Sequence, residues 1–427
     1  MTKRSTLLNN IGEKIKELEI DIKFKDLPIE ELKKITEMLR DLTDFRNNAG
    51  YKLLENSVMI TFIGLLSDCN EWTEIFDFSK VHEEWFEKFL DLTYGLPSLS
   101  TLKRHIAIID PEELEQICVN YIIKKIAELQ KVLGIENKKE NKDIISYDGK
   151  KCNGSKVVDG KNGEIIPTNA MSAYNVDTGI CLATKFIGKK TNEIPTGPDL
   201  IKMLDLTNTI STFDALNTQK KTINAIVDQH GDYVAALKGN QHNFFADVKN
   251  AFDDKDFYEE AFNKSSYEEI EKAHNQTEKR TYVMANNIPW LPKEDWPNLK
   301  SIGLCKKECI KNGITTLEIR YYITSLDITE INDFKRSVRG EWGIENDLHW
   351  HLDYTFKEDY SKTINKNAQS NLNILRKLAL NILKLIQPLY NISLKRIRKR
   401  LVMNFEEEIS NILSYLTIDD LMGAGLI

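Results

Sequence analysis

The sequence predicts a mixed α/β protein, in which a mixed sheet flanked by helices follows an all-α N-terminal domain and carries a β-rich insertion. Two changes of periodicity support this. Residues 1–136 place apolar side chains three and four positions apart, which is typical of helices. From Ile144 onward, short runs of β-branched and aromatic residues appear between helical patterns, and helical spacing returns from Ile331. Strands that alternate with helices indicate a sheet covered by helices.

The N-terminal region, residues 1–136, is predicted to be a helical domain with Leu53–Leu66 at its buried centre. Further along, the helix over Val81–Leu92, the turn at Gly95 and the helix after it have the outline of a helix-turn-helix. Basic side chains and His105 would then be exposed at its tip. Two ordinary packed helices explain the same pattern, so binding of DNA ends is one of two interpretations.

The rest of the chain divides into three parts. Residues 143–253 and 327–390 are predicted to form the α/β domain, with the insertion at 254–326 and a helical C-terminal tail at 391–427. A polar run before residue 143 is typical of a linker. The expected strands of the α/β domain are Ile144–Tyr147, Met171–Val176, Ile180–Gly188, Thr209–Phe213 and Tyr233–Leu237.

Composition excludes several classes of protein. The longest apolar run, Ser57–Ser67, is too short to span a bilayer, and the amino terminus lacks an apolar secretory core. We therefore expect a cytoplasmic protein with no membrane partner. The six cysteines contain no Cys-x-x-Cys pair, so a zinc ribbon is not predicted. The glycine-rich loops of nucleotide sites and the Gly-x-Ser-x-Gly elbow of hydrolases are missing from the sequence.

Charge is unevenly distributed along the chain. The net charge of −7 is unfavourable for a nucleic-acid partner. Residues 357–403, however, hold eleven Lys and Arg against two acidic residues, a local charge of +9. Within them the run Lys395–Arg400 is either a phosphate clamp or a solvated helix end, and we expect its Arg396 and Arg398 to contact DNA.

Three acidic residues are placed where they could meet. Asp148 and Asp214 each end a predicted strand, so neighbouring strands of one sheet would bring both carboxylates to the same edge. Glu345 starts a segment that can be helical, with Ile344 and every fourth residue after it forming an apolar stripe beside the acid. Three clustered carboxylates repel one another, whereas two divalent cations about 4 Å apart would turn them into a clamp for phosphoryl transfer.

Other metal sites are open alternatives. His349, His351 and Asp353 read His-x-His-x-Asp, which on a strand could hold zinc. On a helix the two imidazoles diverge by about 200°. Asp353, Glu358 and Asp359 are alternative third acids to Glu345.

Four segments of the chain resemble a known family. YDGKKCNGS, TFDALNTQK, YVAALKGNQ and RGEWGIENDLHWHLDYTFKED, in that order, resemble the motifs of the H-repeat-associated group of bacterial insertion-sequence transposases. The resemblance implies a ribonuclease-H-like catalytic core in which Asp148, Asp214 and Glu345 bind Mg²⁺ or Mn²⁺. The implied reaction is cleavage of DNA at transposon ends and joining of the 3′-hydroxyl to target DNA.

Further expectations follow from this resemblance. DNA is the implied partner, and a second copy of the chain is expected because two transposon ends must be handled together. The residues expected to contact DNA, besides Arg396 and Arg398, are Lys150, Lys238, Asn240, Gln241 and Arg339.

The sequence also departs from the family pattern. Glu341 replaces a histidine, and Asn153 replaces an arginine, so two donors to DNA would be lost. A catalytically silent DNA-binding remnant and a plain metal-dependent nuclease are therefore alternative functions.

Overall fold

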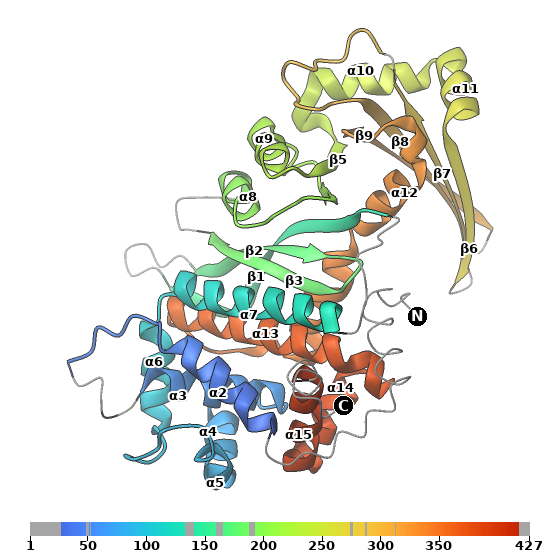
Figure 1. Ribbon diagram of the computed structural model, residues 1–427. Coiled ribbons are helices and arrows are strands. Elements are labelled where there is room, and N and C mark those ends of the chain that lie inside the picture. The colour runs from blue at the N-terminus through green and yellow to red at the C-terminus, as the bar shows by residue number, and fades with distance from the viewer. Residues whose placement is uncertain are drawn as a thin grey trace.

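One sheet runs through the protein. The computed structural model describes residues 27–47, 51, 53–132, 141–158, 165–187, 193–273, 276–286, 288–311 and 313–417. Within these ranges the strands form a single sheet of nine, in the order β3-β2-β1-β4-β5-β9-β8-β7-β6 (Figure 1). The strands are β1 (Asp143–Val158), β2 (Ile165–Asn175), β3 (Ile180–Ile187), β4 (Thr209–Phe213), β5 (Asp232–Leu237), β6 (Ser266–Ala273), β7 (Gln276–Ala285), β8 (Ser301–Lys311) and β9 (Ile314–Thr324).

The half of the sheet made by β1 to β5 is mixed. β1, β2 and β3 form an antiparallel meander, whereas β4 pairs parallel with both β1 and β5. The parallel connection from β4 to β5 runs through a helix, α9 (Lys220–Asp228), as parallel pairing requires. This arrangement confirms the predicted ribonuclease-H-like α/β class.

The predicted insertion at 254–326 extends this same sheet and is not a separate β unit. β9 pairs antiparallel with β5, and β8, β7 and β6 follow it outward. Two helices, α10 (His242–Asp253) and α11 (Lys255–Lys264), cover one face of the extension. The last residues of β5 therefore bond to a strand some eighty positions later, a pairing that local periodicity does not encode.

Helices cover both faces of the sheet. Apolar side chains of α8 (Glu193–Ile201), α9 and α10 pack on one face in a single core cluster. On the other face, α12 (Ile331–Gly340) packs over β1, β4 and β5, and α13 (Lys366–Tyr390) packs over β2 and β3. Figure 1 shows α7 (Pro111–Val132) lying beside α13, below β1, β2 and β3.

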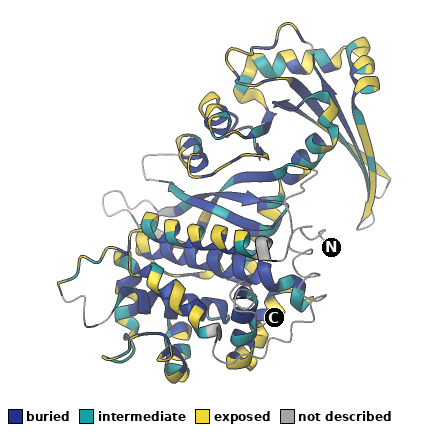
Figure 2. Ribbon diagram, viewed as in Figure 1, coloured by how far each residue is buried: buried dark blue, intermediate teal, exposed yellow. Residues whose placement is uncertain are grey.

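A helical body lies below α7 and α13. Its centre is α3 (Leu54–Leu66), whose residues are all buried, as the sequence predicts. Figure 2 shows that α13 is also buried along most of its length. The C-terminal tail joins this body, because Phe405 packs against Phe78, His82 and Trp85. The other helices of the body are α2 (Leu27–Leu39), α4 (Trp72–Val81), α5 (Glu83–Phe86), α6 (Leu99–Ile108), α14 (Leu394–Met403) and α15 (Phe405–Leu416).

The structure favours ordinary packed helices over a helix-turn-helix. α6, the helix that follows the turn at Gly95, is covered by α13, and Asn371 Nδ2 donates to the carbonyl oxygens of Ile106 and Ile109 at 2.8 and 2.9 Å. His105 is buried and shares a hydrogen bond with Ser57 Oγ, so its predicted exposure is wrong. The predicted linker falls mostly on residues 133–140, outside the described ones. Across the described helices, none has the length and apolarity that a membrane span needs.

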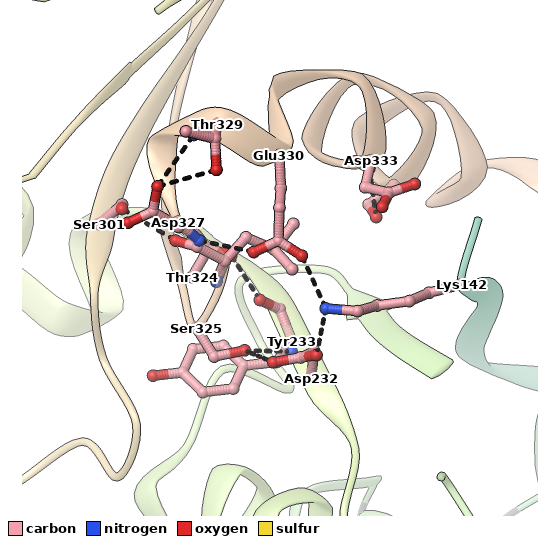
Figure 3. A network of polar contacts seen from close by, with 12 residues as sticks. Lys142, Asp232, Tyr233, Ser301, Thr324, Ser325, Asp327, Thr329, Glu330 and Asp333 are labelled. Carbon is pink, nitrogen blue, oxygen red and sulfur yellow. Dashed lines mark hydrogen bonds and ion pairs between the residues drawn. The ribbon is translucent and has the colours of Figure 1, made fainter. Parts of the chain in front are cut away.

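A polar network fixes the start of α12 to the sheet (Figure 3). Lys142 Nζ donates to Asp232 Oδ2 and to Glu330 Oε1, both at 2.7 Å. On α12, Arg336 donates to the Lys142 carbonyl at 3.1 Å and to Asp177 Oδ1 at 2.8 Å. These directional contacts fix the position of the helix that leads into Glu345.

Candidate active site

Asp148 and Asp214 lie side by side because β1 and β4 are parallel neighbours. Tyr147 of β1 is in register with Phe213 of β4, and the two acids are the next residues in each chain segment. β4 ends at Phe213, but β1 continues to Val158, paired only with β2. The expectation that the first strand ends at Asp148 is therefore wrong: the acid sits where β1 loses its parallel partner.

The segment that carries Glu345 packs against β1. After α12 the chain forms two π-helical turns, η4 (Ile344–His349) and η5 (His351–Thr355). The predicted apolar stripe is fully buried, whereas Glu345 itself is exposed beside it. π-helical turns are rare and occur frequently at functional sites. The stripe consists of Ile344, Leu348, Leu352 and Phe356.

The three acids share one electrostatic environment. Burial raises the pKa of Asp148 to about 7, helped by repulsion from Glu345, Glu193 and Asp214 and opposed by a hydrogen bond from the Gly149 N–H. Asp214 Oδ1 accepts hydrogen bonds from the backbone and side-chain nitrogens of Asn217, both at 3.1 Å. Negative charge at this edge of the sheet is therefore incompletely compensated.

The donor set suits a hard divalent cation. Carboxylate oxygens are the ligands that Mg²⁺ and Mn²⁺ prefer, and a cation would favour the charged form of Asp148, whose pKa is raised by burial and then by repulsion from neighbouring acids. Among the described residues, no three His, Cys, Asp or Glu side chains lie close enough together to hold a metal as they stand. Binding would thus require the side chains of the three acids to converge.

Two further carboxylates, Glu193 and Glu341, border the site, and the sequence analysis placed neither of them there. Glu193, at the start of α8, packs against Gly149, where a Cβ atom would lie 2.4 Å from its Oε1. Burial raises the pKa of Glu341 to about 7, with repulsion from Asp214 adding to the effect and Arg320 opposing it. Glu341 therefore lies inside the site, whereas its expected role was only the loss of a donor to DNA.

Comparison with known proteins identifies the family of the chain. A family model described as the transposase DDE domain matches residues 143–382, more than half of the chain. The chain belongs to this transposase family. A second model, described as DDE_Tnp_1-associated, matches residues 36–122 of the helical body.

Relatives of the transposase cover most of its length. "Putative transposase YncI" of Escherichia coli O157:H7 is 30% identical over 374 residues, which are 85% of this chain and 90% of the relative. "H repeat-associated putative transposase YhhI" of Escherichia coli K12 is 28% identical over 368 residues, 83% of this chain and 91% of the relative. The resemblance to the H-repeat-associated group is confirmed. A piggyBac transposase in a synaptic complex with hairpin DNA aligns over 96% of this chain and 84% of that chain, at 14% identity and a TM-score of 0.38, too low to support an argument.

Lys150 of the transposase is held inside a carboxylate cluster. Its Nζ lies 2.7 Å from Asp353, 3.5 Å from Asp359 and 3.6 Å from Glu358. Burial works against the charged form, but these acids outweigh it and raise the pKa of Lys150. The Lys150 ammonium is thus buried and paired with acids of the protein, which disfavours the DNA contact expected of it. The three alternative third acids gather around this lysine and not around Asp214.

The loop after β5 braces the loop that carries Asp214. Asn240 Nδ2 donates to the carbonyl of Ala215, and Gln241 Nε2 donates to that of Thr218 at 2.9 Å. Both amides that were expected to contact DNA thus make contacts within the protein. Lys238 is exposed at the same edge, and its charge, like that of Arg320, opposes the rise that burial causes in the pKa of Glu341.

The predicted basic surface divides into exposed and buried parts. Arg396 on α14 is exposed, as expected, whereas Arg398 is 1% exposed. Its guanidinium lies 2.9 Å from Asp68 and donates to the Leu65 carbonyl at 2.6 Å, so Arg398 is a structural residue and its predicted DNA contact is corrected. Other cations of the predicted basic segment are also buried: Arg376, Lys377 and Lys384.

Arg339 and the histidines are placed by their neighbours. Arg339 on α12 is paired with Glu269 at 2.8 Å and Glu271 at 3.0 Å, so it joins α12 to β6. His349 faces Asp148, while His351 faces Asp347 and Thr355. The two imidazoles diverge, as a helical segment predicts, and the arrangement does not support a His-x-His-x-Asp zinc site.

Proposed function

We propose that this member of the family is an active DNA transposase that cleaves DNA at transposon ends and joins the 3′-hydroxyl to target DNA. The observation that carries the proposal is the pairing of Asp148 and Asp214 on adjacent parallel strands, with Glu345 delivered over them from α12. All three acids of the triad are retained, which favours activity over a silent remnant.

Asp148, Asp214 and Glu345 would hold two Mg²⁺ or Mn²⁺ ions. Such ions lower the barrier to in-line phosphoryl transfer by stabilising charge on the attacking and leaving oxygens. The surrounding residues of the protein would hold the three carboxylates in position for the ions. Asn217 fixes one oxygen of Asp214, and the braces from Asn240 and Gln241 hold the loop around it.

The proposed DNA surface uses the exposed cations. Lys238 lies at the active-site edge, Arg396 lies on α14, and the side chains of both are exposed. We propose that both contact the phosphate backbone, and that two copies of the chain act together on two DNA ends in the cytoplasm.

The test is a cleavage and strand-transfer assay with Mg²⁺ and DNA that carries the element's own ends. The native chain is compared with Asp148→Asn, Asp214→Asn and Glu345→Gln, and with Asp199→Asn, an exposed acid of α8 paired with Lys202, as the control. Native protein and control should cut and join, while each triad variant should lose at least 10³-fold in rate, on the order of 4 kcal/mol.

Three outcomes separate the functions. Cleavage with joining supports the transposase. Cleavage that never leads to joining supports the plain nuclease, and DNA binding without cleavage supports the silent remnant.

A further inference from the structure

A buried polar tether lies two residues beyond Glu345. The carboxylate of Asp347 lies 2.9 Å from Lys384 Nζ and 3.3 Å from His351 Nε2, and it accepts a hydrogen bond from the Tyr174 hydroxyl. Lys384 Nζ also donates to that hydroxyl at 2.9 Å. Asp347, Lys384 and Tyr174 thus form a closed triangle of contacts, which we call the tether.

The tether joins three elements that are far apart in the sequence. Asp347 belongs to η4, Lys384 to α13 and Tyr174 to β2. Tyr174 is in register with Ser146 of β1, two residues before Asp148. The turn that carries Glu345 is therefore bonded to the strand beside the one that carries Asp148. Lys384 and Tyr174 are buried and Asp347 is partly exposed, so solvent screens these contacts only in part.

Apolar packing alone does not specify where Glu345 points. The stripe that begins at Ile344 is buried by non-directional contacts. A π-helical turn closes around one residue more than an α-helical turn. Because an α-helix advances about 100° per residue, a shift of one residue in this register would rotate Glu345 by that amount relative to Asp148. Directional bonds from Asp347 select one register.

We propose that Asp347, Lys384 and Tyr174 are positioning residues, which hold η4 so that the Glu345 carboxylate can meet those of Asp148 and Asp214. This inference rests on the proposed function, since it concerns the metal ligands of that site. The three residues would affect the affinity for metal indirectly, because none of them is proposed to contact the metal.

If Lys384 affected metal binding only through its charge, its removal would have the opposite effect from the loss of positioning, so the two explanations can be distinguished. Lys384 carries a positive charge near the site, so its removal by charge alone would tighten the binding of a cation. Loss of positioning would weaken it. Lys377 is a matched control, because it is a second buried lysine on α13 whose hydrogen bonds go to the sheet, to Ser172 Oγ of β2 and Thr184 Oγ1 of β3 at 2.8 Å, while only its charge acts on η4, at His349.

The sharpest variant is Tyr174→Phe, which removes one hydroxyl and no charge. Its control is Tyr233→Phe, which removes another buried tyrosine hydroxyl of the sheet, one that donates to the Pro297 carbonyl at 3.0 Å. Lys384→Met and Lys377→Met form the second pair. For the full chain we would measure the dissociation constant of Mn²⁺ from the electron paramagnetic resonance of the unbound ion, and hydrogen exchange of residues 341–356 without metal.

We expect Tyr174→Phe and Lys384→Met to raise the dissociation constant of Mn²⁺ about tenfold and to speed exchange in residues 341–356. Tyr233→Phe should keep native values, and Lys377→Met should keep native exchange and bind Mn²⁺ no more weakly than the native chain, because it too removes a positive charge near the site. Native affinity and exchange in Tyr174→Phe would overturn the inference, as would equal losses in Tyr233→Phe or Lys377→Met. If the native chain binds no Mn²⁺, the proposed function fails, and the exchange rates of 341–356 alone decide the tether.

Discussion

The Nδ1 atom of His349 lies 3.6 Å from Oδ2 of Asp148. Burial, together with the nearby Lys377 and Lys150, lowers the pKa of His349 to about 3, so the imidazole is neutral at neutral pH. The contact is therefore not an ion pair, and it leaves Asp148 with a pKa raised to about 7, mainly by burial. In the metal-free protein this buried carboxyl lowers the free energy of unfolding by an amount that depends on pH.

Asp148→Asn should stabilise the metal-free protein at high pH. The unfolded chain releases the Asp148 proton near pH 3.8, whereas the folded chain retains it to about pH 7. Stability is therefore lost as the pH rises between these values and stays lost above them. We expect the variant to gain on the order of 1–3 kcal/mol in the free energy of unfolding at pH 8 and nothing at pH 3. Urea denaturation with a chelator measures both, and an equal gain at the two pH values would contradict this origin.

Substitutions of Arg398 and Arg396 on α14 should affect different properties, the first stability and the second DNA binding. Arg398→Met removes a buried cation that pairs with Asp68 at 2.9 Å, and we expect a loss of about 3 kcal/mol or more in stability. Arg396→Ala, at an exposed position, should change stability by less than about 0.5 kcal/mol. It should instead weaken DNA binding and lower its salt dependence. Denaturation curves and DNA binding over a range of salt test the pair, and a stable Arg398→Met with weakened DNA binding would refute the assignment.

Gly154→Ala should destabilise the protein. A Cβ atom there would lie 2.0 Å from the Asp359 carbonyl oxygen and 2.9 Å from that of Ser361, and backbone cannot swing aside as a side chain can. We expect a loss of about 1–3 kcal/mol by thermal denaturation. Gly239→Ala is the control, since nothing lies within 4 Å of its added methyl group. Equal stabilities for the two variants would show that the strand moves easily.

Lys142→Met should separate the start of α12 from the sheet. The change leaves Asp232 and Glu330, each 2.7 Å from the ammonium, facing one another without a cation. We expect a loss of about 1–3 kcal/mol in the free energy of unfolding. The control Lys249→Met removes an exposed pair with Asp253 and should cost less than about 1 kcal/mol. If both variants lost the same amount, the network in Figure 3 would have no special role.

Much of the fold and the triad could be predicted from the sequence, because local periodicity carries that information. Runs of two-residue period gave the strands of the mixed sheet, and the spacing of Ile344 and Leu348 gave the buried stripe beside Glu345. Asp148 and Asp214 could be predicted as neighbours because each directly follows a run of strand-forming residues, and these two runs pair in the sheet. Their roles as metal ligands remain a proposal, as do the domain limits.

The sequence by itself determined the fold class, the family and the order of the acids. Only the tertiary structure decided which cations face water: Arg396 does, whereas Arg398 two residues away pairs with Asp68 inside the helical body, and Lys150 is enclosed by acids from 200 positions later. It also decided that β9 joins β5. The physical reason is that a charged side chain and a strand edge are satisfied by whichever partner folding brings near, and partners distant along the chain leave no local pattern.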